Sequence, residues 1–250
     1  MYHIVGMKTA PWDAVRGGCV GRRLWRLVMK KGYHTKVHKF FSKEERDKVK
    51  KATMDAESLS TGEIAVVLVD HSSQYREAEV TGGIFLSSVT SFILSVACFH
   101  GSIWFYVPLS FLFYFPFYML FKKNPVLKVA LVSAKRRQNA VRDRALRAFY
   151  EKGLHRTKDS TGVMFFLSLL ERKVWVIADK GIHEKIKQHE LDRFAHIVSE
   201  GVRTGNACDA LCKAINEMGL LLARYYPVTS EDKNELSDDI IFDSNNQDIA

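Results

Sequence analysis

The feature that most constrains this chain is a long run, from Val80 to Phe121, without any Lys, Arg, Asp or Glu. One membrane-spanning helix needs about 20 apolar residues, and this run is about twice that length. It therefore predicts two crossings, Ile84–Phe99 and Ile103–Phe121, joined at the turn His100-Gly101-Ser102. The alternative is an apolar helical hairpin buried in a soluble core. A flanking domain of this size could hardly bury such a hairpin in addition to its own core, so we expect a membrane hairpin.

Basic residues are distributed unevenly around this run. The turn at residues 100–102 contains no Lys or Arg, whereas the segment after the run contains many: Lys122, Lys123, Lys128, Lys135, Arg136 and Arg137. Because segments rich in Lys and Arg stay in the cytoplasm, both ends of the chain are expected there. This pattern predicts a two-pass protein of the inner (plasma) membrane with both termini cytoplasmic.

The net charge of +9 is divided between a basic beginning and an acidic end. Residues 1–39 predict a basic arm. This arm is either disordered, a helix on an anionic membrane surface, or sequence upstream of a true start at Met29 rather than Met1. Residues 228–250 carry seven acids against Lys233 and predict a mostly disordered acidic tail. This division is not typical of a uniformly basic nucleic-acid binder, so nucleic acid is not an expected partner.

Three apolar runs predict the strands of a small sheet. The run Glu63–Asp70 is continuously apolar between its two acids, which is typical of a strand buried on both faces. The runs Gly162–Leu170 and Lys173–Asp179 are separated only by Glu171-Arg172, and this spacing predicts a tight antiparallel hairpin.

Helical patterns fill the rest of the folded part. Ser42 and Glu45 form a capping box, so a first helix is expected from Ser42 to about Leu59. Further helices are expected over residues 125–152 and 183–203, and from Gly205-Asn206 up to Pro227. These elements predict one discontinuous α/β domain, residues 40–79 with 122–227, interrupted by the hairpin of residues 80–121. Its small mixed central sheet is sandwiched by helices.

The four cysteines, Cys19, Cys98, Cys208 and Cys212, form neither a disulfide framework nor a zinc pattern. Cys208 and Cys212 are spaced i, i+4, which predicts that they line the buried face of the last helix.

Three segments of the chain carry a family resemblance. The run RALRAFYEKGLHRTKDSTGVMFFLSLLERKVWVIADKGIHEKI, from Arg144 to Ile186, closely resembles the TPM-domain family, as does Thr61-Gly62-Glu63-Ile64 ahead of it. The tail segment Asn234-Glu235-Leu236-Ser237-Asp238 resembles that of a bacterial subgroup with a transmembrane hairpin inside the domain. The resemblance covers roughly residues 38–240. It implies an α/β fold and little about activity, since some relatives resemble metal-binding acid phosphatases and others resemble assembly or repair factors.

The order of the strands predicts an acidic edge, independently of the resemblance. A long crossover joins the first strand to the second, so these two are expected to be parallel and the third antiparallel. The start of the first strand, the start of the second and the end of the third then share one edge of the sheet. That edge gathers Glu63, Asp159 and Asp179, with Thr161 close by.

Carboxylates with adjacent hydroxyls are the hard oxygen ligands that Ca²⁺ and Mg²⁺ prefer, so this edge predicts a metal or ligand site. A metal held there could also support hydrolysis of a phosphate ester. The alternative is that Glu63 and Asp179 form ordinary ion pairs with Arg156, Lys158 or Lys180 at the strand ends.

The leading hypothesis is a membrane-anchored TPM-like domain that faces the cytoplasm and binds a ligand or partner, or serves as an assembly or repair module. The alternative hypothesis is a metal-dependent acid phosphatase. The expected partners are the lipid bilayer and either another membrane protein or a second copy of this chain. No catalytic residue can be assigned from the sequence.

Overall fold

The computed structural model describes residues 40–99, 102–157, 160–228 and 239–243. The predicted basic arm of residues 1–39, with Met29, lies outside the described residues. The chain forms two compact units. Met1–Ser72 with Val141–Ala250 is called the sheet unit here, and Ser73–Ala140 is called the hairpin unit.

The sheet unit is built on four strands in the order β3-β2-β1-β4. They are β1 (Ile64–Val69), β2 (Val163–Ser168), β3 (Lys173–Ala178) and β4 (Ile241–Asp243). β1 pairs with β2 in parallel, with Ile64 opposite Val163, and β2 pairs with β3 antiparallel, with Val163 opposite Ala178. The predicted directions of the first three strands are confirmed, and the fold is an α/β fold with a mixed sheet.

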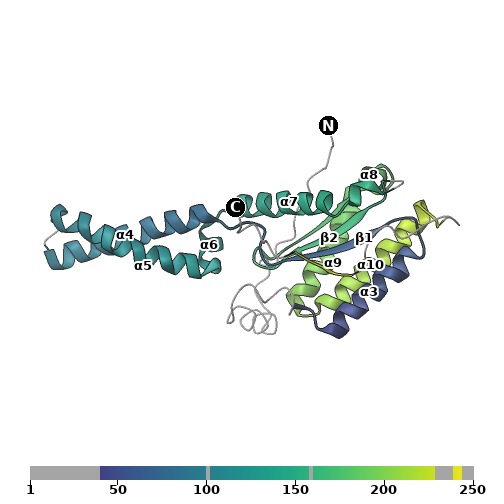
Figure 1. Cartoon of the computed structure of the whole chain (residues 1–250), viewed down its shortest axis with the longest axis horizontal. Coiled ribbons are helices and arrows are strands. Elements are labelled where there is room, and N and C mark those ends of the chain that lie inside the picture. Colours follow the sequence, from purple (N-terminus) through teal and green to yellow (C-terminus); the bar gives the residue numbers. More distant parts are fainter. Residues whose placement is uncertain (1–39, 100–101, 158–159, 229–238, 244–250) are drawn as a thin grey trace. The chain divides into compact units, whose positions relative to one another are not determined.

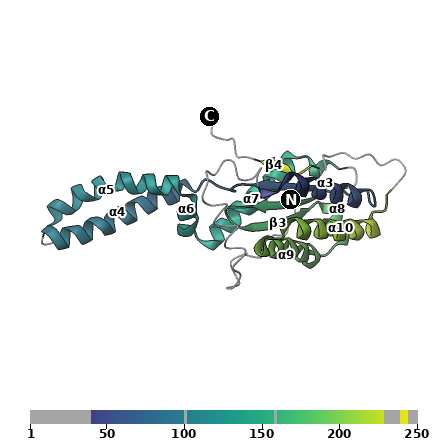
Figure 2. The ribbon, with the colours of Figure 1, turned by 90° about the horizontal axis from the view of Figure 1, so that it is seen from below.

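Helices cover both faces of this sheet (Figure 1). α7 (Ala134–Glu151), which begins in the hairpin unit, covers one face, and α3 (Lys43–Glu57), α9 (Gln188–Thr204) and α10 (Ala207–Tyr225) cover the other. Every residue of β1, β2 and β3 is therefore buried, as their continuous apolar sequences predict. Figure 2 shows α9 and α10 side by side beneath the sheet.

The predicted capping box begins α3. The Ser42 N–H donates to Glu45 Oε2 at 2.8 Å, and the Glu45 N–H donates to Ser42 Oγ at 3.1 Å. These two bonds satisfy backbone donors that have no partner inside the first helical turn.

Two predicted helices are each divided in the structure. The helix expected over residues 125–152 is α6 (Pro125–Leu131) and α7, because Val132 is extended and Ser133 Oγ accepts the Arg136 N–H at 3.3 Å. The helix expected over residues 183–203 is α8 (Lys180–Lys185) and α9. There Ile186 leaves the helical conformation and is buried. Side-chain burial overrides helical propensity at this break.

The turn between β2 and β3 is longer than predicted. β2 ends at Ser168, so residues 169–172 form the loop, and Arg172 adopts a positive φ of 54°. Glu-Arg is an unusual sequence for a two-residue turn. The longer loop does not need the residues that such a turn favours.

Of the acidic tail beyond Val228, the structure describes residues 239–243. Residues 241–243 form β4, which pairs in parallel with β1 and covers its outer edge. Lys50 pairs with Asp239 at 3.0 Å, and the Arg46 guanidinium lies 5.6 Å from the centre of the Phe242 ring. Both contacts join the tail to α3, because Lys50 and Arg46 belong to that helix.

Cys208 is buried in α10, as its spacing predicts, and Cys212 is half-buried. Burial, with the neighbouring Cys212, raises the pKa of the Cys208 thiol to about 12. The thiol is therefore protonated at neutral pH, and this pair is structural rather than nucleophilic.

The hairpin unit contains two helices that are long and apolar enough to cross a membrane, α4 (Arg76–Phe99) and α5 (Ile103–Lys123). α4 starts eight residues before the first predicted crossing at Ile84, so it gives the short apolar segment additional length. The surface of the two helices is largely apolar: Ile84, Phe85, Phe92, Ile93 and Val96 of α4 and Ile103, Trp104, Phe111, Leu112 and Phe115 of α5 are all exposed.

Small polar residues form the contact between α4 and α5. Ser87, Ser91 and Ser95 are spaced by four along α4 and are all buried. Ser88 Oγ and Tyr106 Oη form a hydrogen bond at 2.7 Å, and Ser95 Oγ donates to the Ser102 carbonyl at 3.0 Å. Small side chains at this spacing allow two apolar helices to pack closely, as they do in membranes.

Candidate functional site

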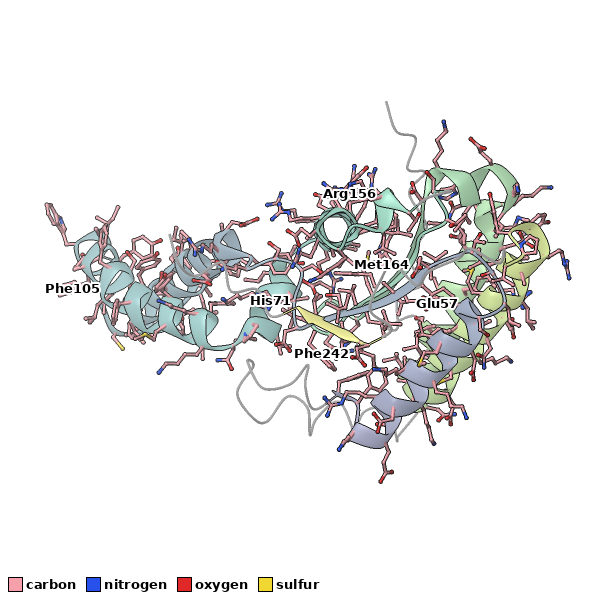
Figure 3. All side chains as sticks on the ribbon, turned by 45° about the vertical axis from the view of Figure 1, so that its right-hand side comes forward. Glu57, His71, Phe105, Arg156, Met164 and Phe242 are labelled. Carbon is pink, nitrogen blue, oxygen red and sulfur yellow. The ribbon has the colours of Figure 1, made fainter. Side chains whose placement is uncertain are left out.

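The acidic edge predicted from the strand order exists in the backbone. The Val163 N–H donates to the Glu63 carbonyl at 2.8 Å, and the Asp179 N–H donates to the Gly162 carbonyl at 2.9 Å. Glu63 and Asp179 therefore flank the segment that begins β2. On the other side of β1, Glu57 of α3 accepts the Ile64 N–H at 2.8 Å. Figure 3 shows Glu57 at this end of β1, with His71 at the opposite end.

Asp179 has one engaged and one unengaged carboxylate oxygen. Its Oδ1 accepts the Lys180 N–H at 2.7 Å, so Asp179 caps α8. Its Oδ2 is buried and has no hydrogen-bond partner among the described residues. The Lys180 ammonium pairs with Glu184 at 3.9 Å. The predicted alternative of an ion pair between Asp179 and Lys180 is therefore absent from the described part of the chain.

The other predicted ligands have different positions. Glu63 is buried at 8% exposure beside the start of β1. Thr161 is buried at 1% exposure, and its hydroxyl donates to the Thr61 carbonyl at 3.0 Å, so it ties the loop before β2 to the segment before β1. Asp159 and Lys158 lie outside the described residues.

The described residues contain no group of three His, Cys, Asp or Glu side chains that could hold a metal ion. The predicted carboxylate ligands that the structure describes, Glu63 and Asp179, have the hard chemistry that Ca²⁺ and Mg²⁺ prefer. The unengaged Asp179 Oδ2 fits such a cation, and a complete ligand set would need Asp159 as well. The metal site stays a prediction.

A closely packed loop positions this edge. The 3₁₀ helix η2 (Leu154–Arg156) brings the Leu154 carbonyl against Gly162, where a Cβ would lie only 2.4 Å from the Leu154 oxygen. The Thr161 N–H donates to Thr157 Oγ1 at 3.0 Å, and Ser160 adopts a positive φ of 54°. These contacts tie Thr161 and Gly162, directly before β2, to residues 154–157.

Residues from α8 and the end of α10 surround the same edge. Tyr226 Oη donates to the Gly181 carbonyl at 2.6 Å, and the Lys185 ammonium lies 3.9 Å from the centre of the Tyr226 ring. Burial lowers the pKa of His183, and the nearby Asp179 carboxylate opposes that effect. Because its pKa lies below the ordinary value, His183 is neutral at pH 7 and can accept a hydrogen bond.

A second polar cluster occupies the opposite end of the sheet. The Ser72 N–H donates to Glu171 Oε1 at 3.0 Å, and the Ser168 hydroxyl donates to Glu171 Oε2. The Ser72 and Ser168 hydroxyl oxygens are 2.9 Å apart, so Ser72 is the donor to Ser168. All three residues are buried. We call Ser72, Ser168 and Glu171 the buried carboxylate cluster.

Sequence reasoning placed the Glu171-Arg172 turn at this end but missed the cluster. Ser168 is a hydroxyl residue inside an otherwise apolar strand, and Glu171 follows it by three positions. That spacing was the available signal. The cluster satisfies its own polar groups, whereas the acidic edge has an unengaged oxygen, so the acidic edge is the better candidate site.

Comparisons with known proteins agree with this geometry. Residues 122–220 match the family model described as the TPM domain, so the predicted resemblance to the TPM-domain family is confirmed over these residues. The matched range begins directly after the uncharged run. β1 and α3 precede that run, and the pairing of β1 with β2 includes them in the same fold.

One solved structure is similar, the NMR structure of the BA42 protein from the psychrophilic bacterium Bizionia argentinensis. The similarity covers 82% of this chain and 96% of that chain, with a TM-score of 0.52 and 20% sequence identity. At this identity the likeness shows the fold alone. A search of curated proteins found no match.

Proposed function

We propose that this chain is a membrane-anchored TPM domain that binds a ligand or partner through the acidic edge of its sheet, with Ca²⁺ or Mg²⁺ as the first candidate ligand. The observation that carries the proposal is the buried Asp179 Oδ2, which has no hydrogen-bond partner among the described residues. A buried carboxylate oxygen without a partner is costly, and a cation would remove that cost.

The proposed anchor is the α4–α5 hairpin. Its support is the length and composition of both helices together with their exposed apolar surface. Because Lys and Arg residues occupy the end of α5 and the segment after it, and none lies in the turn at residues 100–102, we place the sheet unit in the cytoplasm of a bacterial cell. Protease added to intact cells is then expected to leave the sheet unit uncut, and cleavage would reverse this orientation.

Metal binding is tested by titrating CaCl₂ and MgCl₂ into the full-length protein in detergent, followed by calorimetry and by NMR. The dissociation constant for Ca²⁺ or Mg²⁺ is expected to be millimolar or lower. Asp179→Asn is expected to weaken it by about tenfold or more, since one ionic ligand becomes neutral. The exposed Glu184→Gln is the control, because it removes a nearby charge that only pairs with Lys180. The proposed metal site is wrong if no signal changes at millimolar metal.

A second candidate function is a metal-dependent phosphatase. It is favoured by the name of the matched family model, TPM phosphatase, and by the acidic ligands at the edge. The protein would then hydrolyse a generic phosphate ester such as p-nitrophenyl phosphate in the presence of Mg²⁺ or Ca²⁺. Turnover that disappears in both Asp159→Asn and Asp179→Asn would favour the enzyme. Metal binding without turnover would favour the binding role.

A further inference from the structure

The short helix α6 exposes an entirely apolar outer face. Val126, Leu127 and Leu131 are 42%, 38% and 51% exposed, and Ala130 is exposed beside them. At about 100° per residue, these four positions form one continuous arc of the helix. Val129, on the other side, is buried. A seven-residue helix with this surface is not stable alone in water, so its apolar face requires an occupant.

Specific contacts fix α6 to the base of the α4–α5 hairpin. Lys128 pairs with Glu79 of α4, and both side chains are largely buried, at 12% and 10% exposure. Gly82 permits the close approach of α4, because a Cβ there would lie 2.7 Å from Leu131 Cδ1 and 2.8 Å from Phe121 Cζ. α6 therefore lies beside Glu79 and the last residues of α5, at the level where the uncharged run ends.

The chain around α6 is strongly cationic. From Val80 to Arg142 there is no Asp or Glu, while basic residues both precede and follow α6. Lys122, Lys123 and Lys135 are exposed and form no ion pair with any of the described residues. An apolar face continuous with the apolar hairpin surface and bordered by these cations matches the boundary between lipid tails and anionic headgroups.

We propose that α6 lies in the plane of the membrane interface, with Val126, Leu127 and Leu131 inserted below the headgroups. Lys122, Lys123 and Lys135 bind the phosphates of anionic phospholipids. This inference rests on the proposed membrane anchor and adds a lipid preference to it. The occupant is the bilayer rather than a second copy, since the face continues the hairpin surface. The neighbouring acids Glu77 and Glu79 are already paired with Arg136 and Lys128, whereas Lys122, Lys123 and Lys135 have no ion pair among the described residues.

The lipid preference is tested with the full-length chain in vesicles of phosphatidylcholine that contain about 30% phosphatidylglycerol, a composition chosen to give the negative surface charge that attracts cations. Electron spin resonance with spin-labelled lipids is expected to show about threefold or greater preference for phosphatidylglycerol over phosphatidylcholine. The triple variant Lys122→Gln, Lys123→Gln, Lys135→Gln is expected to lose it. The charge-matched variant Lys43→Gln, Lys48→Gln, Lys51→Gln of α3 should keep it. Equal preference in the two triple variants would overturn the proposal.

Insertion of the apolar face is tested with Leu127→Trp in vesicles of brominated phosphatidylcholine. The added emission is expected to be quenched most by lipids brominated near the headgroup, and more strongly than that of Asn139→Trp, an exposed position on α7. Equal quenching at both positions would refute insertion, and a concentration-dependent dimer with unquenched Leu127→Trp would assign the face to a second copy. Extraction of the membranes with alkaline carbonate tests the proposed anchor separately from the proposed position of α6. Release of the protein from the membranes would refute the anchor itself.

Discussion

Replacement of Gly162 by alanine is expected to destabilise the sheet unit by about 3 kcal/mol. The new Cβ would lie 2.4 Å from the Leu154 carbonyl oxygen and 3.1 Å from its carbon. Neither atom can move easily, because both belong to the backbone of η2 and the Leu154 side chain is fully buried. Thermal unfolding of the full-length protein in detergent, followed by near-UV circular dichroism, measures the effect.

Gly153→Ala is the matched control for this substitution. Gly153 has a φ of 78°, but no atom of the residues that the structure describes lies within 4 Å of an added Cβ. Its replacement introduces left-handed strain without a clash and should cost about 1 kcal/mol. If Gly162→Ala destabilises the protein no more than Gly153→Ala does, the close approach of Leu154 to the start of β2 is wrong.

Glu171→Ala is the second substitution with a large expected effect, a loss of about 3 kcal/mol of stability. Glu171 is only 2% exposed, and its removal deprives the Ser72 N–H and the Ser168 hydroxyl of their acceptors. Two buried donors would then have neither a protein partner nor water. Denaturant unfolding in detergent measures the change.

Glu171→Gln separates the effect of the hydrogen bonds on stability from the effect of the side chain's shape. The amide keeps one carbonyl oxygen and nearly the same volume, so a loss of stability of about 1 kcal/mol is expected. Glu184→Ala, at an exposed position of α8, should change stability by less than about 0.5 kcal/mol. A loss for Glu171→Ala as small as that for Glu184→Ala would contradict the buried carboxylate cluster.

Strand positions and directions were predictable because their signals are local or topological. β1, β2 and β3 are continuous apolar runs, and the long connection between the first two requires a parallel pair. The same argument predicted that Glu63, at the start of the first strand, and Asp179, at the end of the third, lie at one edge of the sheet. The capping box at Ser42 and Glu45 was predictable because its two residues lie within one helical turn of each other.

Other features depend on contacts that no local pattern contains. β4 has only three residues, and its place beside β1 is supported by contacts of the tail with α3, such as that between Lys50 and Asp239. The division of residues 125–152 depends on the extended backbone at Val132, which follows a helix held by Lys128 and Glu79. The buried carboxylate cluster joins Ser72 to Glu171, which are 99 positions apart.

The pairing of β1 with β2 also determines the order in which the protein can be made. β1 is translated before both apolar helices, and its partner β2 only after them. At about 5–20 residues per second, roughly five to twenty seconds separate the two strands during synthesis. For that interval β1 is an apolar strand with two unpaired edges, so it is exposed to wrong pairing until β2 has been made.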